Sequence, residues 1–410
     1  MTAGITAGPP ATDAGDPGGF APPPYPYDRL ARLRAEAVVR FGKGGGPGGA
    51  GGVVDCSIGT PCDPPPAPVL DAMARSGTER GYPTSPGSAA YRAAAAGWLQ
   101  RRFGVSVDPE RELAACVGTK EFVASAAQYL HLRNPARDTV LYPAVSYPTY
   151  AMGATLGGCR SVPVRELAQG GPDLGSIDRS DLDRALLLWT NSPSNPTGLL
   201  TDLEAAARWG RQHGVPVFSD ECYAEFTWEG TPATVLASGV DGVVAVHSLS
   251  KRSNLAGARA GFYAGDPDLV GYLLDVRRHA GLMVPGPVQA GAVVAFDDDA
   301  HVLDQRLRYE ERLEYLRGAL GTVELPTPMP AGGFYLWVPV PAGMTGGGWE
   351  LAEALALEVG LLVSPGDLYG PDGARFVRVA VVQPMERLQL VVDRLSRGTL
   401  TERLGGPGSR

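Results

Sequence analysis

The chain has 410 residues, of which 44% are hydrophobic and 20% charged, as in an ordinary globular protein. Its formal net charge of −8 leaves no basic footprint, which excludes nucleic acid and anionic membrane surfaces as expected partners. The five cysteines contain no Cys-x-x-Cys pair, so neither a disulfide framework nor a metal site is predicted. We find no apolar run of ~18 residues and no signal-peptide pattern, and therefore expect a cytoplasmic protein without a membrane span.

The first 52 residues are expected to precede the folded body of the chain. Residues 1–24 are rich in Pro, Gly, Ala and Thr and predict a disordered tail. Residues 25–41 carry apolar side chains at helical spacing and predict an amphipathic helix. The glycine-rich stretch 42–52 follows no strand, so a flexible linker is favoured over a phosphate loop.

From residue 53 to about 290, short apolar runs alternate with helical patterns. This alternation predicts a large α/β domain with a mainly parallel sheet and helices on both faces. The expected strands are 114–117, 139–142, 186–190, 215–219, 242–247 and 260–264, and the expected helices include 88–103, 120–132, 148–157 and 201–213.

The C-terminal part changes character. A long helical block runs from 267 to 320, with a predicted break at 284–287 and a favourable end at Gly321. Strands at 332–338 and 376–381 alternate with helices at 350–359 and 385–396, which predicts a smaller α+β domain over residues 291–397. Residues 398–410 are expected to be frayed.

One stretch combines a buried strand with a lysine. The β-branched run 243–246 predicts a strand, and Lys251 lies just past its end, where open α/β sheets bind ligands. Ser248 and Ser250 precede this lysine, and Arg259 follows it. Burial and cationic neighbours lower the pKa of a lysine, so Lys251 is a candidate Schiff-base amine. On the local pattern alone, an ordinary loop lysine is an equal alternative.

Further candidates lie at other strand ends. Gly118-Thr119-Lys120 stands between a strand and a helix, where backbone amides suit a phosphate, although Gly-Thr is also an ordinary turn and helix cap. Tyr147 lies in a loop near the sheet edge, where its ring could stack on a planar cofactor or pack in the core.

Two polar clusters follow along the chain. Residues 191–198 contain two X-Pro steps and a final glycine, a rigid turn that could direct the amide of Asn195 to a phenolate oxygen. Asp220 follows a buried strand and needs a partner such as a protonated pyridine nitrogen, with Tyr223 three residues later. Taken singly, these residues also suit a plain turn and a helix cap.

The joint order of these motifs resembles one family. Asn-Pro-Thr-Gly at 195–198, Asp-x-x-Tyr at 220–223 and Ser-x-Ser-Lys at 248–251, followed by Arg259, resemble the pyridoxal-phosphate enzymes of the aspartate aminotransferase superfamily, fold type I. The resemblance covers roughly residues 53 to 395. It implies a three-layer α/β/α fold with a smaller C-terminal domain, bound pyridoxal 5′-phosphate, and amino-acid and keto-acid substrates.

The resemblance also implies roles for single residues. Lys251 would form the aldimine and carry the proton, Asp220 would pair with the pyridinium nitrogen, and Asn195 and Tyr223 would bind the phenolic oxygen. Arg378 would bind the substrate α-carboxylate, aided by Gly59 and Asn195. The remaining implied roles are stacking on the ring for Tyr147, binding of the phosphate for Gly118, Thr119, Lys120, Ser248 and Arg259, and binding of the neighbouring subunit's phosphate for Tyr82, which implies a homodimer with shared active sites.

Longer stretches resemble one branch of the superfamily. Residues 246–257, 277–281 and 191–198 are similar to the actinobacterial N-succinyldiaminopimelate aminotransferases, which implies glutamate as amino donor and N-succinyl-2-amino-6-ketopimelate as keto acid. Residues 379–384 depart from that pattern, so a natural-product enzyme is the alternative. It would transaminate, or use the same cofactor for β/γ-elimination, replacement or C–C bond formation. A non-catalytic binding module is disfavoured, because residues 1–52 are too short and too rich in glycine and proline for an added DNA-binding domain.

Overall fold

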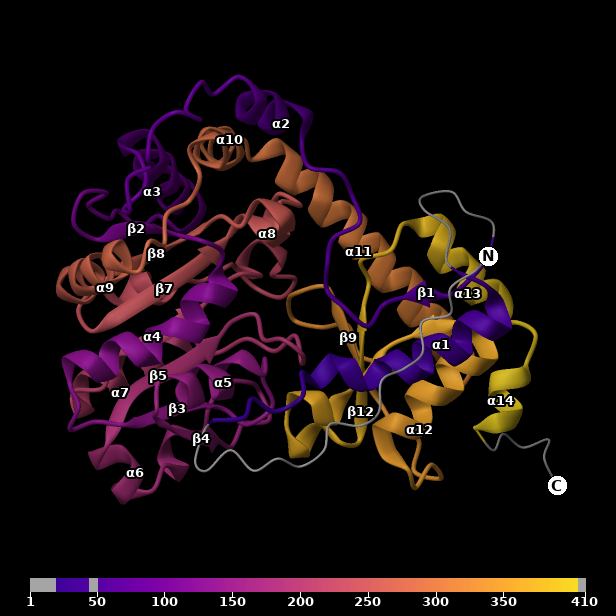
Figure 1. The fold of residues 1–410 in the computed structure, drawn as a ribbon. Helices are drawn as coiled ribbons and strands as arrows, with labels where there is room; N and C mark the ends of the chain where they lie inside the picture. Colours follow the sequence, from indigo (N-terminus) through magenta and orange to yellow (C-terminus); the bar gives the residue numbers. More distant parts are fainter. Residues whose placement is uncertain (1–19, 44–50, 405–410) are drawn as a thin grey trace, which may run out of the picture.

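The structure is a computed structural model that describes residues 20–43 and 51–404 (Figure 1). Most of the expected tail 1–24 and linker 42–52 lies outside the described residues. Among the described helices, none is both long and apolar enough to cross a membrane. The described residues also contain no cluster of His, Cys, Asp and Glu suited to a metal ion.

Within the described residues, seven strands form the central sheet in the order β2-β8-β7-β6-β5-β3-β4. β8 runs antiparallel to both of its neighbours, and the other described pairs are parallel, so the predicted mainly parallel sheet is confirmed. The strand that the sequence analysis did not predict is β4, whose side chains are largely exposed. The bounds are β2 Leu113–Cys116, β3 Thr139–Pro143, β4 Arg160–Val164, β5 Ala185–Asn191, β6 Val217–Asp220, β7 Val243–Ser248 and β8 Gly261–Gly265.

Helices cover both faces of this sheet, as the resemblance to fold type I implies (Figure 1). Alternate strand residues point to opposite faces: Val244 and Val246 pack on one side, and Val243 and Ala245 on the other. The Val244 side is covered by α4 Thr119–Arg133, α5 Thr149–Leu156 and α9 Pro267–His279, and the Val243 side by α3 Ala89–Phe103, α7 Leu203–His213 and α10 Gly286–Asp297, which in turn packs on α2 Ala67–Ala74.

The predicted long helical block divides into three helices. The break at 284–287 is confirmed, because α10 begins at Gly286. A second break at residues 298–299 was not predicted: α11, Ala300–Gly321, follows it, and the Asp298 side chain accepts a hydrogen bond from the Ala300 amide (2.8 Å). This local polar contact is a signal that hydrophobic periodicity does not contain.

The C-terminal part has a hydrophobic core of its own. A three-stranded antiparallel sheet combines β9 Tyr335–Pro339, β11 Ser364–Pro365 and β12 Phe376–Ala380. The C-terminal half of α11, α12 Gly347–Ala354 with the following π-helix Leu355–Val359, and α13 Met385–Leu395 surround it.

Two boundaries differ from the sequence predictions. β1 Val54–Asp55 pairs with β10 Leu361–Leu362, and α1 Leu30–Phe41 packs into the same C-terminal core, so residues 53–56 do not begin the large domain. The expected frayed end is wrong for residues 399–403, which form α14. The apolar side chain of Leu400 is fully buried in that core, and its burial explains the helix.

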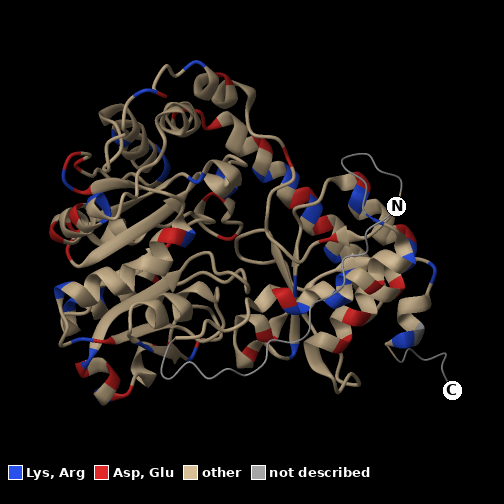
Figure 2. Ribbon diagram, in the orientation of Figure 1, with Lys and Arg blue, Asp and Glu red and all other residues tan. Residues whose placement is uncertain are grey.

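Most charged side chains belong to the helices and loops around the central sheet (Figure 2). Figure 2 shows acidic and basic residues spread over the helices and loops, whereas the strands of the central sheet carry few of them. Asp220 at the carboxyl end of β6 is an exception, because it is a charged residue in a strand of the central sheet.

Candidate active site

A cavity of about 490 Å³ lies at the carboxyl ends of β5, β6 and β7. It is walled by both parts of the chain, since Lys251 lies just after β7 of the large sheet and Arg378 lies on β12. The predicted site residues that line it are Gly59, Thr119, Lys120, Tyr147, Asn195, Asp220, Tyr223, Ser248, Lys251, Arg259 and Arg378.

Lys251 is held at the end of β7 by a short helix, α8 Leu249–Arg252. Ser248 caps this helix, and its Oγ accepts a hydrogen bond from the Ser250 amide (3.0 Å). The Lys251 ammonium donates to the carbonyl oxygen of Gly59. Burial lowers the pKa of Lys251 to about 8, and nearby Arg378 acts in the same direction. With this pKa about a tenth of the amine is neutral at pH 7, far more than for an ordinary lysine, and a nucleophilic lysine reacts as the neutral amine.

Asp220 ends β6 and is buried. One carboxylate oxygen accepts a hydrogen bond from the Tyr150 hydroxyl (3.0 Å), and the other from the Cys222 amide (3.2 Å). Burial raises the pKa of this carboxyl group. Both donors are neutral, so the carboxylate is suited to a cationic partner inside the cavity.

Gly118 and Arg259 form a cradle beside the N-terminus of α4. Gly118 has φ +77°, and a Cβ at this position would stand 2.2 Å from Arg259 Nη2, so glycine is required there. Arg259 Nη1 donates to the Ala256 carbonyl oxygen (2.9 Å), which fixes the guanidinium. With Thr119 at the first turn of a fifteen-residue helix, the cradle is suited to a phosphate.

Arg378 enters from the C-terminal part and is 2% exposed. Its Nη1 donates to Asn195 Oδ1 (2.8 Å) and its Nη2 to the Ser57 carbonyl oxygen (2.7 Å). The guanidinium lies over the Tyr335 ring, 4.4 Å from its centroid. The buried Nε has no hydrogen-bond partner among the described residues, so the group retains donors for a carboxylate.

Lys120 lies at the mouth of the cavity. Its ammonium donates to the Tyr25 hydroxyl (3.1 Å) and lies 6.0 Å from the centroid of the Tyr147 ring. The ammonium is therefore directed to tyrosines rather than to the cradle. Only the Lys120 backbone, on the first turn of α4, stays beside Gly118. The chain contains three lysines, and two of them line this one cavity.

The sequence analysis missed several tyrosines of the site. Tyr150 binds Asp220, and Tyr335 shares a hydrogen bond with the Tyr223 hydroxyl (O–O 2.8 Å). Tyr25 and Tyr27 reach the cavity from the N-terminal segment, which was expected to lie apart from the body. Their signal in the sequence is only an aromatic cluster at 25–27. In contrast, the predicted residue Tyr82 is fully exposed and does not line the cavity.

The chain belongs to the class I and II aminotransferases, since the family described as Aminotransferase class I and II matches residues 52–395 of its sequence. It is 41% identical over 382 residues to the probable aminotransferase Rv1178 of Mycobacterium tuberculosis, covering 91% of this chain and 85% of the relative. It is 40% identical over 382 residues to the 4-dedimethylamino-4-oxo-anhydrotetracycline transaminase OxyQ of Streptomyces rimosus, covering 91% of this chain and 99% of the relative.

Solved structures agree with this assignment. The probable N-succinyldiaminopimelate aminotransferase from Thermus thermophilus matches with a TM-score of 0.80 and 30% identity, covering 91% of this chain and 99% of that one. The aminotransferase from Neisseria meningitidis matches with a TM-score of 0.81 and 30% identity, covering 92% and 98%. The predicted fold type I and the predicted enzyme class are confirmed.

Members of this family use pyridoxal 5′-phosphate, and the cavity fits that group. The cradle of Gly118 and Arg259 suits its phosphate, and buried Asp220 suits its pyridine nitrogen. Lys251 presents an amine with a lowered pKa for its aldehyde. When bound, the cofactor withdraws electrons from the substrate carbon that loses a proton.

Proposed function

We propose that this chain moves an amino group from glutamate to a keto acid, with N-succinyl-2-amino-6-ketopimelate as the first candidate acceptor. The observation that carries the proposal is the pair of cations on the substrate side of the cavity, Arg378 and Lys120. A donor with a carboxylate at each end would satisfy both. The Thermus relative, which is named for a succinylated substrate, supports the same chemistry.

Each side chain would contribute one task. Arg378 would bind the α-carboxylate with its remaining N–H donors, and Tyr335 would hold the guanidinium from the side. Lys251 Nζ would take the proton from the substrate carbon and return it on the cofactor side, a task for which a pKa of about 8 is suitable. Asp220 would keep a positive charge opposite its carboxylate and so favour the withdrawal of electrons.

The proposal is tested with purified enzyme and two amino donors. Addition of glutamate should remove the visible absorption band of the cofactor, and Lys251→Ala should lack that band from the start. Lys120→Gln should raise the KM for glutamate about tenfold and leave the KM for alanine unchanged, since one lost hydrogen bond to a charged group costs about 1.5 kcal/mol. An unchanged band with glutamate would count against transamination, and equal effects on both donors would count against Lys120.

A second candidate acceptor is a polycyclic keto compound of natural-product biosynthesis. The similarity to OxyQ over 99% of its length favours it, because that relative is named as a transaminase of a tetracycline intermediate. Elimination, replacement and C–C bond formation are the remaining alternatives on the same cofactor. Product analysis with each acceptor and labelled glutamate separates these reactions, since only transamination transfers the labelled nitrogen.

The proposal includes a homodimer with shared active sites. Tyr82 supports it, because this tyrosine is fully exposed and does not line the cavity of its own chain. In a dimer its hydroxyl would bind the phosphate in the partner's cavity.

A further inference from the structure

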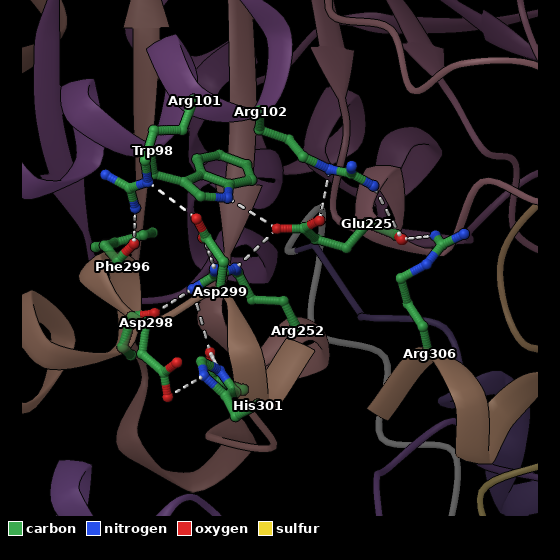
Figure 3. Close-up of polar contacts among 12 residues, drawn as sticks. Trp98, Arg101, Arg102, Glu225, Arg252, Phe296, Asp298, Asp299, His301 and Arg306 are labelled. Carbon is green, nitrogen blue, oxygen red and sulfur yellow. Dashed lines mark hydrogen bonds and ion pairs between the residues drawn. The ribbon is translucent and has the colours of Figure 1, made fainter. Parts of the chain in front are cut away.

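A buried polar cluster centred on Glu225 includes Arg252, the residue next to Lys251 in the chain (Figure 3). We call it the Glu225 hub; it consists of Glu225 and the side chains that bind its carboxylate, Trp98, Arg102 and Arg252. Glu225 lies in a 3₁₀ turn, Ala224–Phe226, directly after Tyr223. It is 6% exposed and is not among the residues that line the cavity.

The Glu225 carboxylate joins three side chains from two helices. Trp98 Nε1 donates to Oε1 (2.8 Å), and Arg252 Nε donates to the same oxygen (3.2 Å). Arg102 Nε lies 2.7 Å from Oε2. Trp98 and Arg102 belong to α3, and Arg252 belongs to α8, so Glu225 ties the short helix of Lys251 to a fifteen-residue helix.

Arg252 is the residue next to Lys251 and is 2% exposed. Its Nη1 donates to the Ala295 carbonyl oxygen (2.5 Å), and its guanidinium lies 5.3 Å from the centroid of the Trp98 ring. α8 has only four residues, and so short a helix is not stable by itself. The position of α8, and with it that of Lys251, therefore depends on such tertiary contacts.

The C-terminal end of α8 is also held by a hydrogen-bonded series of Ser253, His301 and Asp298. Ser253 Oγ lies 2.8 Å from His301 Nε2, and His301 Nδ1 lies 3.0 Å from Asp298 Oδ2. The order resembles a nucleophilic triad, but Ser253 is 0% exposed and lines neither the candidate active-site cavity nor the four other main cavities of the described residues. The series instead ties the end of α8 to the start of α11.

The hub also contacts the helix that enters the C-terminal core. Arg306 on α11 donates to the Glu225 carbonyl oxygen and, through Nη2, to the Thr227 carbonyl oxygen (3.0 Å). Further along α11, Tyr309 and Leu313 are buried in that core. Glu225 thus connects the Lys251 helix, the Tyr223 loop and the helix that reaches the Arg378 side of the cavity.

We propose that Glu225 is a positioning residue that acts through Arg252 to hold α8 and thereby places Lys251 opposite Tyr223 and Arg378. The inference rests on the proposed role of Lys251. Removing the Glu225 charge leaves buried Arg252 with only the more distant carboxylate of Asp299 (3.7 Å), and it takes the carboxylate partner from half-buried Arg102. α8 then loses its fixed orientation, and the proton-transfer step slows while the substrate-binding groups remain in place.

Glu225→Gln tests the proposal in the holoenzyme, with Glu110→Gln as the matched control. Glu110 binds buried Arg92 on the same helix α3 (2.6 and 2.7 Å) but does not contact α8. We expect Glu225→Gln to lower kcat about tenfold, because a small misplacement of a reacting group slows catalysis strongly. The KM for glutamate should stay within about twofold, since the substrate-binding groups do not move. The pH midpoint of the visible cofactor band should also move, whereas Glu110→Gln should change neither kcat nor that midpoint.

The pathway through Arg252 is tested by the double variant. Glu225→Gln with Arg252→Gln should be no slower than Arg252→Gln alone, because both changes remove the same link. Additive losses, or an unchanged kcat and midpoint in Glu225→Gln with only a lower Tm, would overturn the proposal. If Glu225→Gln does not fold, Arg252→Lys is the substitute. It retains the positive charge but loses the planar guanidinium, and it should lower kcat while leaving the KM for glutamate almost unchanged. A visible band that survives in Lys251→Ala would instead overturn the role of Lys251.

Discussion

Lys251 lies in a cavity where burial works against its positive charge. Its pKa in the folded chain is about 8, against 10.5 for an ordinary lysine. Between these two values the unfolded chain binds more protons than the folded chain, so this residue makes stability rise with pH. Below pH 8 both states are protonated and the cost of the buried charge is constant.

The rise of stability with pH leads to a prediction for the cofactor-free protein. Wild type should gain stability relative to Lys251→Met as the pH rises from about 8 to about 10, because the buried amine becomes neutral. Denaturant unfolding of the two proteins across this range measures the difference. A difference that does not change with pH would show that the amine is not desolvated.

Gly118 offers a second prediction at the scale of one residue. Gly118→Ala should weaken retention of pyridoxal phosphate at least about tenfold, because the new methyl group would stand 2.2 Å from Arg259 Nη2 and displace the guanidinium that is expected to bind the phosphate. Gly104→Ala is the control: its φ is similar at +69°, but nothing lies within 4 Å of the added Cβ. Equilibrium dialysis against the cofactor compares the two, and equal losses would assign the effect to backbone strain alone.

The site could be predicted where one residue type has one task at a strand end. Lys251, Asp220 and Arg259 follow buried strands or their loops, and the cavity contains all three. Tyr335 and Tyr150 could not be found in this way, because their tasks depend on partners far away in the sequence. Asn195 shows an intermediate case: it lines the cavity as predicted, but its side-chain oxygen also accepts from Arg378, which comes from another part of the fold.

At the scale of elements, buried strands were predicted best. β5 is buried along all seven residues, so its apolar run is a strong signal. β4 was missed because it lies at the sheet edge with mostly exposed residues. α14 was missed because a short helix after a glycine gives little periodicity, although Leu400 is completely buried.

α14 provides a prediction about stability. Ending the chain after residue 398 should lower the free energy of unfolding by about 2–4 kcal/mol, the usual cost of losing one buried leucine. The truncation also removes the ion pairs of Arg403 with Glu353 and Glu358. Ending the chain after residue 404 keeps α14 and serves as the control. If both truncated chains unfold at the same denaturant concentration as the full chain, α14 does not stabilise the core.

At the scale of the whole molecule, the role proposed for Tyr82 would connect the cavity with a second copy of the chain. If the active sites of the proposed homodimer are shared, mixing inactive Lys251→Ala with Tyr82→Ala should restore about a quarter of wild-type activity, since half of the dimers are hybrids with one complete site. Activity after refolding the mixture measures this complementation. A mixture no more active than the average of its two components would contradict shared sites.

The pairing of β1 with β10 joins an early segment of the chain to a late one. Val54 lies opposite Leu361, and α1 packs in the core that these strands share with α13. During synthesis, α1 and β1 leave the ribosome early, but β10, with which β1 pairs, emerges only after about residue 361. The central sheet can be assembled in the meantime, because its strands all lie between residues 113 and 265. The apolar faces of α1 and β1 therefore remain unpaired until translation is almost finished, and nascent chains arrested before residue 361 should be those that chaperones bind.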